Sequence, residues 1–437
     1  MSTLKAVRGT RDLLPPETAL WNRIEATARS VFARYNFGEI RTPIFEDTSL
    51  FARGVGQETD IVSKEMYTWE DRARAASEKA QSLTLRPENT AGVVRAYIEH
   101  KLGETGQLQK LYYIGPQFRR ERPQKGRYRQ FFQIGAEVIG PQSAGSESPV
   151  RDAEVLEMLA TLLDELGITG WTLNLNSVGS SADRARYNDA LRAALEPVKD
   201  KMCEDCQRRA VTNPLRVLDC KVPEDQPIIE TLPKIADSLD EESKEHFAAV
   251  TAALDASGVP YTRNHRLVRG LDYYTRTTFE FTHGGLGAQN ALLGGGRYDG
   301  LSENIGGPKA PGIGFAIGLD RLVLTLQAQD ADKAAATEKI HAFIAPMADA
   351  KNPDKLKVIN AAALELAREL RRAGLGIELG EGSFRLKKSF EAADRVARRI
   401  VILGEDELQS GILTVKDFSS GVQTKVPRAE LVAFLAV

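Results

Sequence analysis

Cysteine is scarce in this chain of 437 residues, which contains only Cys203, Cys206 and Cys220. Three thiols cannot form a complete disulfide framework, so the sequence predicts a protein of a reducing compartment. Apolar runs of the ~18–20 residues that a bilayer-crossing helix needs are also missing, and the first residues lack the apolar stretch of a secretory signal. We therefore expect a cytoplasmic protein and neither a disulfide-stapled secreted module nor a membrane-spanning one.

An excess of one charge is missing too, because 58 Lys and Arg residues face 60 Asp and Glu residues, a net charge of -2. That balance excludes a globally basic nucleic-acid binder. The chain contains no GxxxxGK[ST] loop, HExxH pair or GxSxG elbow. Their absence excludes P-loop nucleotide chemistry and gives no support to a zinc hydrolase or an α/β-hydrolase.

The three thiols have part of the spacing of a zinc site, with Cys203 and Cys206 separated by two residues and Cys220 downstream. A structural zinc takes four ligands. No second CxxC is present, and His246 is the first histidine that follows. The missing fourth ligand favours ordinary thiols, and no metal bound by cysteine or histidine is expected.

Hydrophobic periodicity predicts a β-rich region with flanking helices over most of the chain. Helices are expected over about 17–35 and 152–166. An edge strand is expected over 38–45, and a long antiparallel hairpin from strands at 111–114 and 131–139. Further strands are predicted over 171–176, 267–268, 273–281 and 291–293.

A change of character divides the chain further. Charged helical segments broken by prolines over about 180–258 predict an insertion within the β-rich domain, and 327–339 has the composition of a linker. Beyond the linker, strands and helices alternate as in a βαβ-type domain with a mixed sheet. The expected divisions are 1–179, 180–258, 259–326, 327–339 and 340–437.

The strongest local anomaly is the loop of the expected hairpin, residues 119–129, which contains six cations and one acid. Arginine donates paired hydrogen bonds to phosphoryl oxygens. A solvated basic turn would explain such a loop equally well in general. Its position between two aromatic-rich strands favours a phosphate site here.

Two further segments suit a ligand pocket. Residues 269–276 run from Arg269 into Tyr273 and Tyr274, and core packing would explain the tyrosines but not the arginine. Glycine-rich turns are expected at 294–300 and 312–318. The second mimics a dinucleotide fingerprint, but prolines precede it where a strand should end. We expect its glycines instead to let a strand and a helix pack closely against a ligand, with Arg321 at the helix start.

Together these motifs resemble the class II aminoacyl-tRNA synthetases, and within them the histidyl-tRNA synthetase family, from about Val7 to the carboxyl terminus. Residues 8–12 are similar to the family's opening signature. The segments that resemble class II motifs 1, 2 and 3 are 38–47, with Pro43 as the interface proline, 118–121 and 314–321. Residues 85–88 and 267–274 are the ones typical of the histidine-specific family.

The resemblance implies an α+β fold, in which helices flank the antiparallel β-sheet of a class II catalytic core, with a helical insertion and a C-terminal mixed α/β anticodon-binding domain. It implies a homodimer that activates L-histidine with ATP and Mg²⁺ and transfers it to tRNA(His). The alternative is a non-enzymatic relative, the histidine-binding regulatory subunit of ATP phosphoribosyltransferase. Segments 269–274 and 340–437 argue against that alternative, and the first also argues against another class II synthetase.

Site residues follow from the same resemblance. Arg119 would hold the ATP α-phosphate and act in catalysis with Arg269, which would lie beside the reacting carboxylate. The remaining ATP-binding residues would be Glu121, Arg127 and Arg321. Histidine would be bound by Arg269, Glu88, Thr90, Gln133, Glu137, Tyr273 and Tyr274, and the tRNA acceptor end would meet Arg122 and Gln124.

Elementary chemistry agrees with these roles. A carboxylate that attacks a phosphate brings two anions together, and arginines placed in advance offset their repulsion. Three positions depart from the family pattern. Asn89 stands where glycine is common, Phe132 where histidine is frequent, and Asp320 where glutamate is usual. The shorter Asp320 should be tolerated if its role is only to orient Arg321. Many cations of the last domain suit tRNA phosphates as well as solvent; they are Arg368, Arg371, Arg372, Arg385, Lys387, Lys388, Arg395, Arg398 and Arg399.

Overall fold

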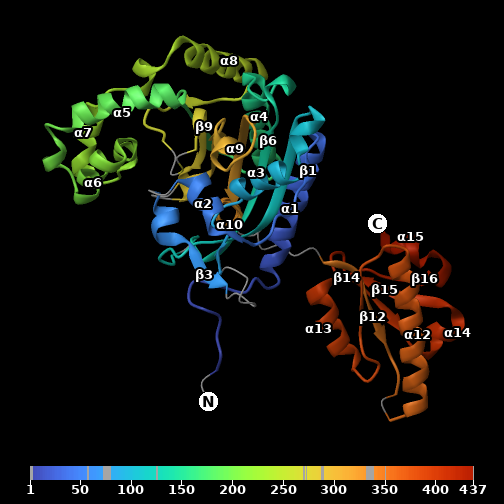
Figure 1. The fold of residues 1–437 in the computed structure, drawn as a ribbon. Helices are drawn as coiled ribbons and strands as arrows, with labels where there is room; N and C mark the ends of the chain where they lie inside the picture. Colours follow the sequence, from blue (N-terminus) through green and yellow to red (C-terminus); the bar gives the residue numbers. More distant parts are fainter. Residues whose placement is uncertain are drawn as a thin grey trace. The chain divides into compact units, whose positions relative to one another are not determined.

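The chain forms two compact units, Met1–Ala335 and Ala336–Val437, in the computed structural model of Figure 1. The structure describes residues 3–56, 59–71, 80–124, 126–268, 271, 273–286, 290–330, 339–349 and 351–436. Most of the expected linker lies outside these residues. The first residues of that expected linker form the C-terminal end of helix α10 (Leu319–Gln329).

The larger unit is built on an eight-stranded sheet with the order β1-β5-β6-β11-β10-β9-β7-β8. Neighbouring strands are antiparallel except at the two edges, where β1 and β8 pair in parallel. This sheet confirms the predicted antiparallel core. Its strands are β1 (Gly38–Glu39), β5 (Gln109–Phe118), β6 (Gln130–Ile139), β7 (Trp171–Ser177), β8 (Thr262–Arg263), β9 (Thr275–His283), β10 (Ala291–Arg297) and β11 (Gly312–Gly318).

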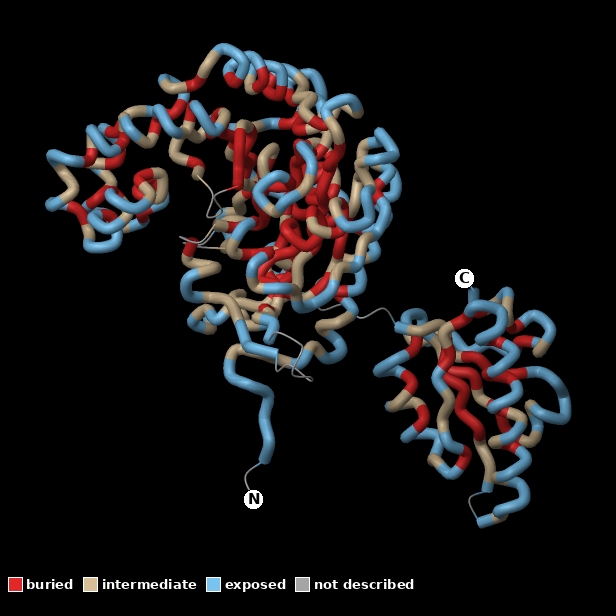
Figure 2. The backbone as a smooth tube through the Cα atoms, in the orientation of Figure 1, coloured by how far each residue is buried: buried red, intermediate tan, exposed pale blue. Residues whose placement is uncertain are grey.

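Helices bury the apolar side chains of this sheet. In α1 (Glu17–Arg34) the buried residues Leu20, Ile24, Ala28 and Val31 recur every three or four positions, which places them on one face of the helix. They share one core with α4 (Pro149–Glu165), α8 (Glu241–Ser257) and α10. Figure 2 shows the buried backbone concentrated in the central strands. The helices predicted over 17–35 and 152–166 are confirmed.

The predicted hairpin is present as β5 and β6, which pair from Gln109↔Ile139 to Phe118↔Gln130. Beside it, a smaller three-stranded sheet is formed by β2 (Phe45–Asp47), β4 (Gln81–Leu85) and β3 (Tyr67–Asp71). The short helices here are α2 (Thr48–Val55), the π-helix η1 (Ile61–Glu65), α3 (Thr90–Glu99), the 3₁₀-helices η2 (Leu102–Thr105) and η3 (Gln142–Ala144), and α9 (Leu301–Asn304).

Three local predictions were wrong. Residues 267–268 form no strand, because the Asn176 amide, and not a neighbouring strand, donates to the Leu267 carbonyl (3.0 Å). Residues 294–297 are not a turn but the end of β10, and residues 312–318 are not a turn but strand β11. Glycine is required there for close packing between strands, since a Cβ at Gly295 would lie 2.1 Å from the carbonyl oxygen of Gly314.

A helical segment connects β7 to β8 and has a small hydrophobic core of its own. It contains α5 (Ser181–Leu195), α6 (Glu204–Thr212), α7 (Gln226–Glu230) and the short 3₁₀-helices η4 (Lys199–Lys201), η5 (Pro214–Asp219), η6 (Pro223–Asp225) and η7 (Ile235–Ser238). Helix α8 follows, and its residues Val250 and Leu254 join the main core instead.

The smaller unit is a mixed sheet with the order β13-β12-β14-β15-β16, parallel at the first two pairings and antiparallel at the others. Its strands are β12 (Ile340–Pro346), β13 (Ile377–Leu379), β14 (Ala397–Leu403), β15 (Ile412–Asp417) and β16 (Gln423–Pro427). Its helices are α12 (Pro353–Arg372), α13 (Leu386–Val396), α14 (Glu405–Ser410), η9 (Arg428–Glu430) and α15 (Leu431–Ala436). Across the described residues, none of the helices has the length and apolarity to span a membrane.

Candidate active site

A cavity of about 250 Å³ opens in the larger unit between the β5–β6 hairpin, strands β9–β11 and the first turns of α3 and α10. It brings together nine of the residues predicted from the sequence. They are Glu88, Thr90, Arg119, Glu121, Arg127, Gln133, Tyr273, Tyr274 and Arg321. Segments separated by more than 200 positions therefore meet at one pocket.

Four predicted residues are placed differently. Glu137 is fully buried and lies beneath the pocket wall, while Arg122 and Gln124 are exposed on the loop after β5. Arg269 lies outside the described residues, so its predicted position is untested. Its neighbour Leu271 does line the pocket.

The acidic end of the pocket is built on the N-terminus of α3. Both carboxylate oxygens of Glu88 accept backbone N–H groups of the first turn, from Thr90 (2.7 Å) and Ala91 (3.0 Å). Burial raises the pKa of Glu88, and these two hydrogen bonds oppose the rise. The helix start thus holds the carboxylate in one orientation inside the protein.

Glu137 is a second buried carboxyl group, one layer deeper. It accepts hydrogen bonds from the Thr90 hydroxyl (2.8 Å) and the Tyr298 hydroxyl (2.7 Å), and both donors line the pocket. Burial raises the pKa of Glu137 to about 8, in spite of these donors. The absence of a side chain at Gly314, on the paired strand β11, makes room for it.

A buried amide oxygen and a buried tyrosine also belong to this end of the pocket. The side-chain oxygen of Gln133 is buried and, among the described residues, has no hydrogen-bond partner. Tyr273 packs against Tyr274 (ring centroids 4.8 Å apart) and Tyr298 (5.9 Å). Burial raises the pKa of Tyr273, so its hydroxyl stays protonated and able to donate. This end suits a small polar ligand with both donors and acceptors.

The opposite end of the pocket is cationic. Arg119 is held by a hydrogen bond from Nε to the Pro87 carbonyl (2.9 Å) and packs over the Phe131 ring at 5.2 Å. Arg127 donates to Glu121 at 3.1 Å, and Glu121 also lies 3.9 Å from Arg119. A guanidinium fixed through Nε leaves its two terminal nitrogens to face an anion.

Asp320 has a partner that the sequence analysis did not name. Its carboxylate accepts a hydrogen bond from Arg11 (2.8 Å), which also binds Glu17 (2.8 Å). Arg11 further packs over the Tyr128 ring at 4.8 Å. Burial raises the pKa of Asp320, and the Arg11 guanidinium opposes the rise. The opening segment 8–12 is thereby fastened to the motif 3 helix and to the loop after β5.

Sequence reasoning missed several pocket residues, namely Tyr113, Tyr128, Phe131, Glu280 and Tyr298. One signal could have found Phe131, because it shares a face of β6 with Gln133 and Glu137 at a period of two. Tyr298 carried no such signal. It follows β10 and reaches Glu137 only through the packing of β10 on β11 and β6.

Comparisons with known proteins agree with this geometry. The family model "Histidyl-tRNA synthetase" matches residues 9–322, and "Anticodon binding domain" matches residues 341–437. The chain is 71% identical to the histidine–tRNA ligase of Koribacter versatilis (strain Ellin345) over 433 residues, 99% of this chain and 96% of the relative.

Solved structures agree as well. The apo histidyl-tRNA synthetase of S. aureus is similar with a TM-score of 0.78 and 38% identity, covering 100% of both chains. A Bacillus halodurans C protein described as an ATP phosphoribosyltransferase regulatory subunit/histidyl-tRNA synthetase is similar in fold. Its TM-score is 0.64 at 18% identity, with 92% of this chain and 99% of that chain covered.

Proposed function

This chain belongs to the histidyl-tRNA synthetase family, and we propose that its pocket carries out the family's ATP-dependent joining of histidine to tRNA. The activity is that of a histidine–tRNA ligase. One observation supports placing the chemistry in this pocket: an acidic, hydrogen-bonding end and an arginine end meet in a single cavity. A zwitterionic amino acid and a polyphosphate require that pair of environments.

At the acidic end we assign the amino group of histidine to Glu88, Thr90 and the side-chain oxygen of Gln133. A positively charged amino group favours the ionised form of Glu88 and satisfies the unpaired Gln133 oxygen. We assign the imidazole to Tyr274 and Glu137, with Tyr273 packed beside them. Glu137 acts on the imidazole through a small shift of Thr90 or Tyr298, which now occupy its oxygens.

At the other end we assign the ATP phosphates to Arg119, Arg127 and Arg321, and the adenine to Glu121. The carboxylate of histidine attacks the α-phosphorus, and pyrophosphate leaves. Charge accumulates on the phosphoryl oxygens during this step, and fixed guanidinium groups stabilise it without reorganising. Arg269 is proposed to lie between the two reacting anions, where it reduces their repulsion.

Mg²⁺ is proposed to accompany ATP. It prefers oxygen ligands and keeps several waters, so it binds mainly through phosphate oxygens and one or two carboxylates. Glu280 is a pocket carboxylate near which those phosphates would lie. When bound, Mg²⁺ neutralises the charge of the leaving pyrophosphate.

The tRNA is proposed to use two surfaces. Arg122 and Gln124, exposed after β5, meet the acceptor end beside the pocket. The unit at 340–437 binds the anticodon stem through cations on α12 and α13. The domains we assign are a catalytic domain (1–179 and 259–326), an insertion (180–258), a linker (327–339) and this anticodon-binding domain. The free thiols suit a cytoplasmic location.

A homodimer is proposed through the motif 1 region. Ile44, Phe45 and Trp69 are 45%, 53% and 40% exposed on or beside the three-stranded sheet, and grouped apolar side chains on a surface favour association. Buried Arg86 fixes this region by donating to the Thr42 carbonyl (3.0 Å) and the Pro116 carbonyl (2.9 Å). Through Arg86, a dimer contact at Pro43 would therefore be connected to strand β5 and to the loop that follows it.

The regulatory-subunit alternative is not favoured, because the curated relative that shares 71% of the residues is a ligase. The proposal is tested by aminoacylation of tRNA(His) transcripts with labelled histidine, with Arg122→Ala as a second enzyme. We expect charged tRNA from the wild type. For Arg122→Ala we expect unchanged adenylate formation but slower transfer to tRNA. Slower adenylate formation in Arg122→Ala would contradict its assignment to the acceptor end.

A further inference from the structure

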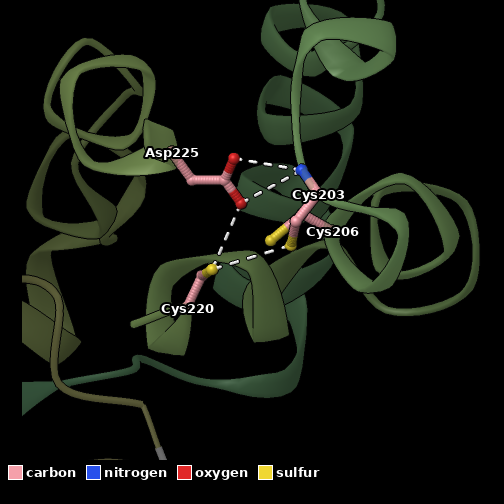
Figure 3. A group of neighbouring side chains, drawn as sticks. All are labelled: Cys203, Cys206, Cys220 and Asp225. Atoms are coloured by element: carbon pink, nitrogen blue, oxygen red, sulfur yellow. Dashed lines mark hydrogen bonds between the residues drawn. The ribbon is translucent and has the colours of Figure 1, made fainter. Parts of the chain in front are cut away.

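Three cysteines and one aspartate of the insertion point toward a common centre, well away in sequence from every pocket residue (Figure 3). Cys203 precedes α6 and Cys206 lies in its first turn, Cys220 follows η5, and Asp225 ends η6. The three sulfur atoms and a carboxylate oxygen all lie within 4.8 Å of one another. The fold thus supplies the fourth ligand that the sequence search for Cys and His did not find.

The charge of this cluster is unbalanced. Asp225 is almost fully buried, and no Lys or Arg forms an ion pair with it among the residues that the structure describes. Its hydrogen bonds come from the cysteines: the Cys203 backbone N–H donates at 3.0 Å and the Cys220 thiol at 3.2 Å. A buried carboxylate is costly unless a cation or a metal compensates it.

The distance between two of the sulfur atoms is already close to that in a tetrahedral zinc site. Zinc–sulfur bonds of about 2.3 Å place two ligand sulfurs about 3.8 Å apart, and the Cys203 and Cys220 sulfurs are 3.9 Å apart. The Val222 backbone N–H also donates to the Cys220 sulfur at 3.4 Å. Such an N–H bond stabilises a thiolate ligand and orients it toward a metal.

We propose that Cys203, Cys206, Cys220 and Asp225 bind one zinc ion per chain, with release of the thiol protons to solvent. Three sulfur ligands and one oxygen in a closed tetrahedral arrangement favour Zn²⁺ over Mg²⁺ or Ca²⁺, which prefer oxygen. The site has no open position and shares no residue with the pocket, so its role is structural.

The small hydrophobic core of the insertion would be stabilised by a metal cross-link. Its separate core contains fourteen buried residues, of which Cys206 and Cys220 are two, and small cores of this kind are commonly reinforced by a metal. One zinc ion joins α6, η5 and η6 at the point where their chain segments meet. The proposal concerns folding of the insertion and is independent of the chemistry assigned to the pocket.

The experiment is metal analysis of the full-length protein, purified without chelators or affinity tags that bind metal. We expect about one zinc per chain by mass spectrometry of the elements. After removal of zinc under reducing conditions, titration with Co²⁺ should give the sulfur-to-cobalt charge-transfer band and the visible bands of a tetrahedral site. This test uses the wild type, so it does not depend on the folding of a variant.

Variants then identify the ligands. We expect Cys206→Ser to lose the zinc and Asp225→Ala to bind it at least tenfold more weakly in competition with a chelator. Asp219→Asn, a half-exposed carboxylate beside Cys220, is the matched control and should keep it. The proposal is overturned by a metal-free wild type without a cobalt spectrum, by iron in place of zinc, by a disulfide between two of the cysteines, or by unchanged affinity in both ligand variants.

Discussion

Arg119 is the described residue to which we assign the largest part in the chemistry of the pocket. Its Nε is fixed to the Pro87 carbonyl and its plane packs on Phe131, so little rotational freedom remains to be lost when an anion binds. At the other end of the pocket, Glu88 is held by two backbone N–H groups. Arg119 and Glu88 are therefore oriented before any substrate arrives, which is how fixed charges contribute to rate.

Arg119→Ala should lower histidine-dependent ATP–pyrophosphate exchange by about 10²–10³-fold, the cost of removing one oriented donor to a developing charge. Arg208→Ala, on the exposed side of α6, is the matched control and should keep normal exchange. Circular dichroism and the thermal midpoint establish that both variants are folded. Wild-type exchange in Arg119→Ala would refute the assigned role.

Glu137 predicts a dependence of stability on pH. Its pKa rises from the usual 4.5 to about 8 in the folded protein, so the folded state keeps a proton that the unfolded chain has released. Stability due to this group is therefore lost as pH rises from about 4.5 to 8. We expect the thermal midpoint of the wild type to fall more between pH 5 and pH 9 than that of Glu137→Gln.

The comparison with Glu137→Gln isolates this group, because every other titrating residue is common to both proteins. Glu303→Gln, an exposed carboxylate on α9, should follow the wild type at each pH. Parallel curves for Glu137→Gln and the wild type would mean that Glu137 is ionised in the folded protein at neutral pH.

At the scale of elements, the pocket depends on how closely β10, β11 and β6 approach one another. A Cβ at Gly314 would lie 1.7 Å from the Glu137 carboxylate and 2.7 Å from the Ala136 carbonyl. Overpacking of this kind costs roughly 1–3 kcal/mol or more. Gly314→Ala should lower the free energy of unfolding by at least that amount and impair histidine activation.

Gly318→Ala is the control for this prediction, because it lies on the same strand and its Cβ would meet nothing closer than Arg321 at 3.7 Å. We expect its stability in urea to stay within about 1 kcal/mol of the wild type. Equal stability of the two variants would show that the close packing at Gly314 relaxes without cost.

Elements also show what the sequence could predict. Periodicity found α1, α4 and the β5–β6 hairpin because their buried faces repeat along one segment. It did not find that Arg11 binds Asp320, which is 309 positions away, since no local pattern encodes that pair. Asp225 was missed for a simpler reason: a search for cysteine and histidine ligands does not count a carboxylate.

At the scale of the whole molecule, a net charge of -2 conceals a local excess of cations in the loop at 119–129, which contains six cations and one acid. The two units have separate cores. Amino-acid activation is therefore assigned to the first unit, and recognition of the anticodon to the second. Cations placed locally in this way can bind polyanions although the protein as a whole is not basic.

The proposed homodimer is a prediction at the same scale. Sedimentation should give twice the chain mass for the wild type, and Phe45→Glu should shift the equilibrium toward the monomer by placing a charge among apolar side chains. Val422→Glu is the control, an equally exposed apolar site (58%) on the second unit, and should remain dimeric. A monomeric wild type would contradict the assignment.

The central claim is that this pocket activates histidine with ATP. The most direct measurement is ATP–pyrophosphate exchange with each of the twenty amino acids supplied singly, with no tRNA present. We expect rapid exchange with histidine and background exchange with the others, because only an imidazole can form the hydrogen bonds assigned to Tyr274 and Glu137. Exchange that depends on a different amino acid, or no exchange with histidine, would contradict it.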